Sequence, residues 1–222
     1  MGSLSYGLIS LQMDSLTIRT WMQGIAESMR AERDHLVALD SAIGDGDHGI
    51  NMTRGFDAVE VAIGAEPDAT PGRLLILSGK TLVSTVGGAS GPLWGSALRA
   101  AGRTLGDRAE VAPEQLVEAL AAALAAVRDL GAAAPGDKTM VDALEPAINA
   151  LRAGVAAGRP LADALAAAEE AAGAGMRTTI PMQARKGRAS YLGERSIGHQ
   201  DPGATSTTLI IGALRRATAG AA

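Results

Sequence analysis

Residues 112–131 read APEQLVEALAAALAAVRDLG, a segment built almost entirely from residues that favour an α-helix. Pro113 suits the first turn of a helix, and Gly131 is a typical stop signal. The whole chain shares this bias, because hydrophobic residues make up 47% of it and aromatic residues only 2%. A core of small side chains suits closely packed helices, and no segment offers the alternation typical of a strand. The composition therefore predicts an all-α fold.

Hydrophobic periodicity extends this reading along the chain. Ile18, Trp21, Met22, Ile25 and Met29 recur at three- and four-residue spacing, which predicts a helix over about residues 15–38. The other predicted helices run over about 50–63, 70–86, 92–105, 112–131, 136–158, 160–184 and 204–220. The sequence thus predicts a single domain of eight antiparallel helices at residues 14–222, in a bundle or a closed ring, after an N-terminal tail at residues 1–13.

Bulk charge and composition exclude several function classes. The formal charge of −4 argues against a nucleic-acid or anionic-membrane partner, which would need a basic face. The absence of cysteine excludes disulfides and thiolate chemistry. The N-terminus lacks the pattern of a signal peptide, and the apolar runs are too short to span a bilayer. We therefore expect a cytoplasmic protein.

The first of four glycine-rich joints carries a cluster of carboxylates. In LDSAIGDGDHGIN, residues 39–51, Asp40, Asp45 and Asp47 lie within eight residues and repel one another unless a cation sits among them. Oxygen ligands are what Mg²⁺ prefers, and Mg²⁺ takes further ligands from substrate phosphates. The alternative is an Asp-Gly turn with helix-capping aspartates.

The second joint, GGASGPLWG at residues 87–95, offers an anion site. Its glycines leave backbone N–H groups free, and the helix predicted to begin at Pro92 adds the positive end of its dipole. The sequence is not a Walker A loop, because no Gly-Lys-Ser/Thr follows. A tight turn that needs glycine for its backbone angles would give the same pattern.

The third and fourth joints are GDKTMVDAL, residues 136–144, and GRASYLGERSIGHQDPGA, residues 187–204. In the third, Lys138 fits a solvated surface charge, and Met140 fits either the core or an apolar wall for a flat ring. The fourth carries arginines and Asp201 on a long polar connection, a type of loop that is often functional. Taken together, the joints supply the parts that phosphoryl transfer requires, namely cation ligands, an anion loop and an arginine-bearing lid.

With all four motifs present in this order, the chain resembles the nucleotide-binding L subunit of dihydroxyacetone kinases from about residue 14 to its C-terminus. The resemblance implies a closed barrel of eight antiparallel helices with the nucleotide held by the loops at one end. It also implies that Asp40, Asp45 and Asp47 hold two Mg²⁺ ions. The nucleotide-binding positions that it implies are His48, Gly49, Ile50, Asn51, Ala89, Ser90, Gly131, Met140, Arg188, Asp201, Pro202 and Gly203.

The same resemblance implies a function. Bound Mg-ADP would be phosphorylated by a phosphohistidine protein of the phosphotransferase system, the M subunit. The phosphoryl group would then pass to dihydroxyacetone on a separate K-type subunit, since the nucleotide domain takes up the 222 residues. The alternatives are the nucleotide subunit of an ATP-dependent ketose kinase and a nucleotide- or metal-sensing module without turnover. The sequence leaves open the donor, the acceptor ketose and the oligomeric state, including a homodimer.

Overall fold

The computed structural model describes residues 13–219 of the chain. Over these residues it contains nine α-helices, one 3₁₀ helix and a two-stranded sheet. The helices are α1 (Ser15–Ala31), α2 (Arg33–Ile43), α3 (His48–Gly64), α4 (Pro71–Thr85), α5 (Ser90–Leu105), α6 (Pro113–Gly131), α7 (Val141–Ala156), α8 (Leu161–Thr178), the 3₁₀ helix η1 (Arg188–Ser196) and α9 (Pro202–Ala219). The strands are β1 (Met13–Asp14) and β2 (Glu110–Val111), which pair antiparallel. The predicted all-α class is confirmed.

The helix count differs from the predicted eight because of two segments. The helix predicted over 15–38 breaks at Glu32 into α1 and α2 and continues to Ile43, while the polar connection forms η1. At the break, the Thr53 hydroxyl of α3 donates to the Met29 carbonyl at 3.1 Å, an acceptor that an unbroken helix would pair with the N–H of Arg33. Asp40 consequently lies on the last turn of α2, not in the joint itself.

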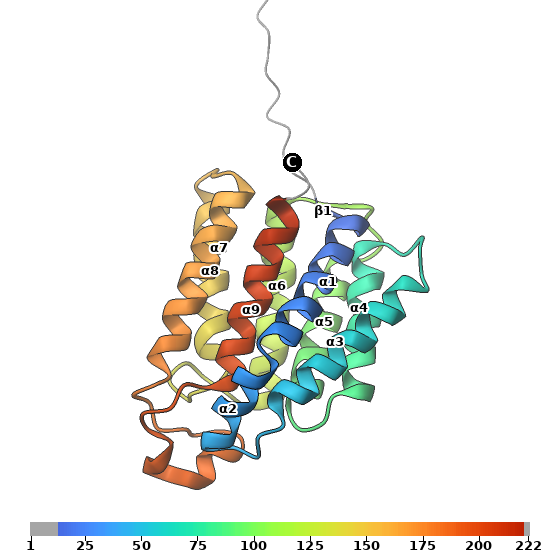
Figure 1. The fold of residues 1–222 in the computed structure, drawn as a ribbon. Coiled ribbons are helices and arrows are strands. Elements are labelled where there is room, and N and C mark those ends of the chain that lie inside the picture. Colours follow the sequence, from blue (N-terminus) through green and yellow to red (C-terminus); the bar gives the residue numbers. More distant parts are fainter. Residues whose placement is uncertain (1–12, 220–222) are drawn as a thin grey trace, which may run out of the picture.

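The long helices pack in the order of the sequence. From α3 to α9 each contacts the next, and α1 contacts both α3 and α9. Figure 1 shows these helices running alternately up and down. The Trp21 indole of α1 donates to the Ile210 carbonyl of α9 at 3.0 Å inside the core, which joins the first long helix to the last.

Small residues allow the closest of these contacts. A Cβ on Gly79 of α4 would lie 2.5 Å from the carbonyl oxygen of Gly95 in α5, and a Cβ on Gly95 would lie 2.7 Å from the carbonyl oxygen of Gly79. Only glycine therefore fits at either position. This contact accounts for part of the chain's preference for small residues over aromatic ones.

The last residue of the predicted N-terminal tail, Met13, packs against the helices. Met13 belongs to the sequence-predicted tail of residues 1–13, but it is buried and pairs with Val111 in the short sheet. Residues 1–12 of that tail lie outside the described part of the chain. The two strands have two residues each, too few for a periodic signal in the sequence.

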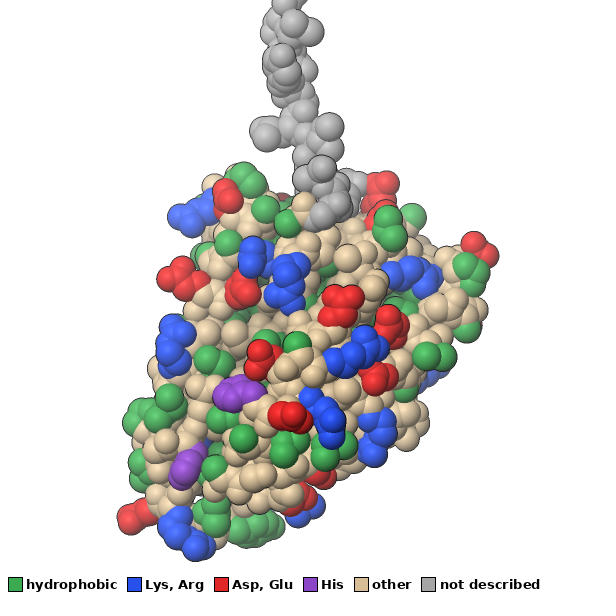
Figure 2. All heavy atoms as spheres, in the orientation of Figure 1, with side chains coloured by type: hydrophobic (Ala, Val, Ile, Leu, Met, Phe, Trp, Pro, Cys, Tyr) green, Lys and Arg blue, Asp and Glu red, His purple; other side chains and the backbone are tan. Residues whose placement is uncertain are grey.

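Surface charges on the α1, α3 and α9 side are mixed. Figure 2 shows acidic and basic side chains interspersed on this face. Arg30 of α1, for example, pairs with Asp57 and Glu60 of α3 at 2.8 and 2.7 Å. None of the helices between residues 13 and 219 has the length and apolarity needed to cross a bilayer.

Candidate phosphate and metal site

A cavity of about 260 Å³ lies at one end of the helices, where the four glycine-rich joints meet. In Figure 1 this is the lower end, beside α2 and η1. Most of the predicted site residues line this cavity: Asp40, Asp45, Asp47, His48, Ala89, Ser90, Gly131, Met140, Arg188, Asp201, Pro202 and Gly203. Residues from four separate joints therefore come together in one place, as the sequence predicted.

Three predicted positions do not line the cavity. Gly49 is buried against α2, where a Cβ would lie 2.1 Å from the carbonyl oxygen of Arg33. The Asn51 amide oxygen accepts a hydrogen bond from Arg54 at 2.8 Å, and Ile50 is exposed. Gly49, at least, allows α3 to approach α2 closely, so it shapes the joint that carries the carboxylates.

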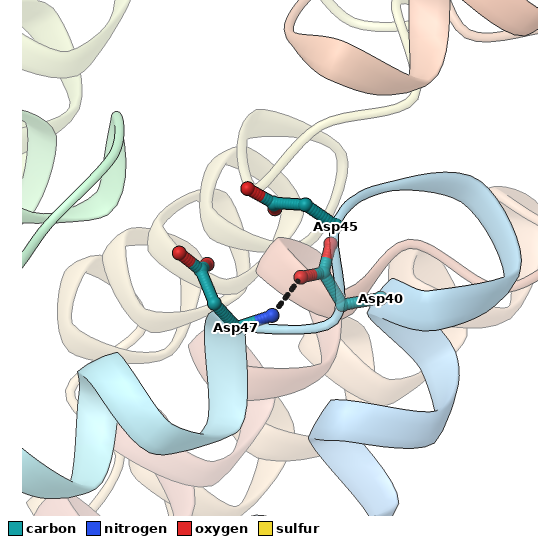
Figure 3. Close-up of side chains that lie close together, drawn as sticks. All are labelled: Asp40, Asp45 and Asp47. Carbon is teal, nitrogen blue, oxygen red and sulfur yellow. Dashed lines mark hydrogen bonds between the residues drawn. The ribbon is translucent and has the colours of Figure 1, made fainter.

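The three aspartates converge as a ligand set. One carboxylate oxygen from each of Asp40, Asp45 and Asp47 lies within 4.8 Å of the others. Asp40 is fixed by the backbone, because its Oδ2 accepts the N–H of Asp47 at 2.8 Å (Figure 3) and also the N–H of His48 at 3.1 Å. The donor set consists of hard oxygen atoms in a small space, which fits Mg²⁺.

Two glycines make this arrangement sterically feasible. A Cβ on Gly44 would lie 2.1 Å from Asp40 Oδ1, so a side chain there would collide with the carboxylate. Gly46 has a φ of +74°, in the region that favours glycine. The Gly-Asp-Gly-Asp order is thus explained by the turn as well as by its carboxylates.

Four helices begin at the cavity. The first residues of α3, α5, α7 and α9, which are His48, Ser90, Val141 and Pro202, all line it. Helix α5 begins at Ser90, two residues earlier than predicted, after a turn in which Gly88 has a φ of +65°. Helix N-termini carry partial positive charge and free N–H groups, so their convergence favours a bound anion.

His48 links two of these N-termini. Its Nε2 lies 3.0 Å from Ser206 Oγ of α9, and its Nδ1 lies 3.2 Å from Ser90 Oγ of α5. Burial lowers the pKa of His48, and the nearby Asp40 and Asp47 charges act in the opposite direction. A neutral imidazole can accept at one nitrogen and donate at the other, so it can orient the Ser90 hydroxyl in the glycine turn.

The third joint forms an apolar wall and contains a correction. Met140 lines the cavity together with Leu93, Val127 and Val141, which the sequence did not single out because they read as ordinary core residues. Lys138, which fitted a solvated charge, is in fact buried with 1% of its surface exposed. Its side chain donates to backbone carbonyls, a role that no sequence pattern signals.

The fourth joint brings Arg188 to the aspartates. Arg188 begins η1, and its Nη2 lies 3.1 Å from Asp45 Oδ2. The arginine side chain is 67% exposed, so this pair contributes little to folding. Arg188 is therefore well placed to face a charged ligand in the cavity, and Lys186, which the sequence did not single out, lines the cavity beside it.

Asp201 closes the site from the α9 side. Its Oδ2 accepts the N–H of Ala204 at 2.7 Å, which caps the first turn of α9, and its own N–H donates to Thr179 Oγ1 at 3.0 Å. Burial raises the pKa of Asp201 to about 7, against the lowering effect of the Ala204 hydrogen bond. The protonation of this carboxyl group therefore changes near neutral pH.

The fold and the cavity together define an all-helical domain in which carboxylates, helix N-termini and an arginine surround one space. That arrangement is expected of a protein that binds a metal–phosphate ligand. Comparison with known proteins is more specific, because residues 42–216 match the model of the DAK2 domain. The chain belongs to the DAK2 domain family.

Individual relatives cover nearly the whole chain. It is 42% identical to the PEP-dependent dihydroxyacetone kinase, ADP-binding subunit DhaL, of Escherichia coli K12, over 90% of this chain and 96% of that one. It is 38% identical to the PTS-dependent counterpart of Lactococcus lactis, over 90% and 97% of the two chains. The crystal structure of the C. freundii dihydroxyacetone kinase with AMP-PNP and Mg²⁺ is 27% identical, with a TM-score of 0.70, over 97% of this chain and 37% of that one.

Proposed function

We propose that the chain is the nucleotide-binding subunit of a dihydroxyacetone kinase that holds Mg-ADP as a cofactor. The observation that carries the proposal is the convergence of three carboxylates, four helix N-termini and Arg188 on one cavity. The near full-length match to proteins named as ADP-binding subunits supports it. The match to subunits of dihydroxyacetone kinases supports a K-type subunit as the partner, which would carry dihydroxyacetone.

The fold proposal goes with the site. We infer that α1 and α3–α9 close into a barrel of eight helices, with α2 and η1 as additions at the site end. The contacts of α1 with both α3 and α9 support this inference. A closed ring holds four joints at one end at fixed separations, which suits a ligand that touches all four.

The site residues fall into three groups, which would bind the metal ions, the phosphates and the adenine base. Asp40, Asp45 and Asp47 would hold two Mg²⁺ ions, which supply positive charge to neighbouring phosphate oxygens. The helix N-termini, Ser90 and Arg188 would hold the phosphates. Gly49, Ile50 and Asn51, which do not line the cavity, would support the phosphate end as part of α3. The wall beside Met140 and Gly131 would take the adenine ring.

In the proposed reaction, Mg-ADP in this site accepts a phosphoryl group from a phosphohistidine protein and passes it to dihydroxyacetone on the K-type subunit. The chain's own residues form no covalent bond in this scheme. They orient the phosphates, screen their charge and restrict water, which are the main demands of phosphoryl transfer.

A second candidate is the nucleotide subunit of an ATP-dependent ketose kinase. It is favoured by the likeness to the C. freundii kinase, whose structure contains the triphosphate analogue AMP-PNP. The two candidates differ in whether the nucleotide stays bound or exchanges with solution.

The two candidate functions are separated by dialysis and by comparing turnover with the two phosphoryl donors. The purified protein, loaded with Mg-ADP and dialysed extensively, should retain nucleotide. With a K-type subunit and dihydroxyacetone, it should turn over far faster with the phosphohistidine donor than with ATP. Arg188→Ala should release ADP faster and lose activity, whereas the control Arg195→Ala, at an exposed arginine of the same 3₁₀ helix, should not. Equal rates with ATP would contradict the cofactor mechanism, and no turnover with either donor would contradict the kinase assignment.

A further inference from the structure

Lys138 is a buried cation that lines the cavity but has no role in the proposed function. It lies in the joint between α6 and α7, two residues before Met140, and has 1% of its surface exposed. Its backbone is left-handed, with a φ of +61°, a conformation uncommon for a residue with a side chain. Both features cost free energy, so some other contact must compensate for them.

The compensation comes from three backbone carbonyls. Lys138 Nζ donates to the carbonyl oxygens of Thr179 at 2.8 Å, Met182 at 3.1 Å and His199. An ammonium group has three hydrogens, so these acceptors satisfy it completely. Burial lowers the pKa of Lys138, while the charge of Asp201 opposes this shift.

The three carbonyls lie at the two ends of one segment. Residues 179–201 leave α8, carry Arg188 and η1, and return to α9. Further hydrogen bonds close the base of this segment, since the N–H of Gly198 donates to the Ile180 carbonyl at 2.8 Å. The N–H of Arg185 also donates to the Asp137 carbonyl at 3.0 Å, which ties the segment to the joint that contains Lys138.

We propose that Lys138 is a positioning residue for the bound nucleotide, acting through the segment 179–201. By fastening both ends of the segment to the α6–α7 joint, it holds Arg188 at the cavity, beside Asp45. The inference rests on the proposed nucleotide site. It goes beyond that proposal because it assigns a role to Lys138, which donates to the backbone of the segment.

If Lys138 served only the global stability of the fold, its substitution would have different effects from those expected of a positioning residue. Lys138→Met keeps most of the side-chain volume but leaves the three carbonyls without their donor. The core contacts between α1 and α9, such as Trp21 with Ile210, do not involve this joint. The loss should therefore loosen the segment before it affects the rest of the fold.

The test measures the dissociation rate of a fluorescent ADP analogue in Mg²⁺ by stopped flow. Wild type, Lys138→Met, Arg188→Ala and the double variant are compared, with Lys80→Met as a control at an exposed lysine. Lys138→Met should raise the rate by about tenfold, within the range for substitutions coupled to a site. The double variant should be no faster than Arg188→Ala alone, because Lys138 acts through the segment that carries Arg188.

Each other outcome has a definite meaning. Additive effects of Lys138→Met and Arg188→Ala, or an unchanged rate in Lys138→Met, would overturn the positioning role while leaving the nucleotide site in place. Absence of Mg-dependent binding in wild type would overturn the proposed function itself. If Lys138→Met does not fold, Lys138→Gln replaces it in the same cycle, because its amide can still donate to two of the carbonyls.

Discussion

The connections at the two ends of the helices differ in their charged side chains, because three aspartates meet at the cavity end, where Lys138 also donates to backbone carbonyls. At the end away from the cavity, arginines satisfy backbone carbonyls at helix C-termini. Arg19 donates to the Ile63 carbonyl in the last turn of α3 and to the Glu66 and Pro67 carbonyls that follow it, and Arg108 donates to the Leu105 carbonyl at the end of α5. Cations at helix C-termini stabilise the fold. The N–H groups of these arginines are used in hydrogen bonds within the chain.

At the cavity end, carboxylates satisfy backbone N–H groups, and the cluster of Asp40, Asp45 and Asp47 also keeps oxygen atoms for other partners. Asp40 accepts two N–H groups through Oδ2 alone, and its Oδ1 remains among the aspartate oxygens. Asp142 accepts the N–H of Thr139 at 2.8 Å through Oδ2 and the N–H of Gly136 at 2.5 Å through Oδ1, and Asp201 accepts that of Ala204. The comparison indicates that one end is built for stability and the other for a ligand.

The largest effect is expected from removing a carboxylate at the cavity end. Asp45→Ala should weaken Mg-dependent ADP binding by about a hundredfold or more, since even groups that only support a metal ligand are worth up to that much. Stability without ligand should hardly change, because among residues 13–219 the ion-pair partner of Asp45 is an exposed arginine alone. Isothermal titration checks the affinity, with Asp107→Ala at the other end as a control. An unchanged ADP affinity in Asp45→Ala would remove the metal assignment.

Ligand should stabilise the protein through this end alone. At about a hundred times its dissociation constant, a ligand adds about 2.7 kcal/mol to the free energy of unfolding, or about 5–10 °C in melting temperature for a chain of this size. ADP with Mg²⁺ should produce this rise, and ADP in EDTA should produce very little of it. An equal rise in EDTA would show that the carboxylates do not act through a cation.

Breaking the opposite end should cost stability without affecting binding. Arg19→Met leaves the carbonyls after α3 without their donor and should lower the free energy of unfolding by about 1–2 kcal/mol. The exposed Arg103→Met on α5 serves as the control. Thermal melting measures the loss, and titration should give a wild-type affinity for Mg-ADP. A weaker affinity in Arg19→Met would contradict the division between the two ends.

The smallest effect concerns the protonation of Asp201. A carboxyl group with a raised pKa in the folded state adds stability below its unfolded pKa of 3.8, and this stability is lost as pH rises through about 7. Asp201→Asn can still cap α9 but has no charge to bury. Without ligand it should therefore melt above wild type at pH 8, and by a clearly smaller margin at pH 5. A difference that is the same at both pH values would show that Asp201 is not titrating.

The sequence predicted the cavity end well because its residues are grouped in motifs. The carboxylates, the glycine turn and Arg188 stand in short stretches whose chemistry is visible without coordinates. Lys138 was misread because its partners are backbone carbonyls 41 to 61 residues away, which leave no side-chain pattern. The break between α1 and α2 was missed for a similar reason, since the contact made there, from the Thr53 hydroxyl to the Met29 carbonyl, joins residues 24 positions apart.

Amide hydrogen exchange with and without Mg-ADP tests the division between the ends most directly. The account predicts slower exchange with ligand at residues 44–47, 86–89, 132–140 and 179–201, which form the joints around the cavity. It predicts no change at residues 65–70, 106–112 and 157–160, which connect the helices at the other end. Protection spread equally over both sets of connections, or confined to the second set, would contradict it.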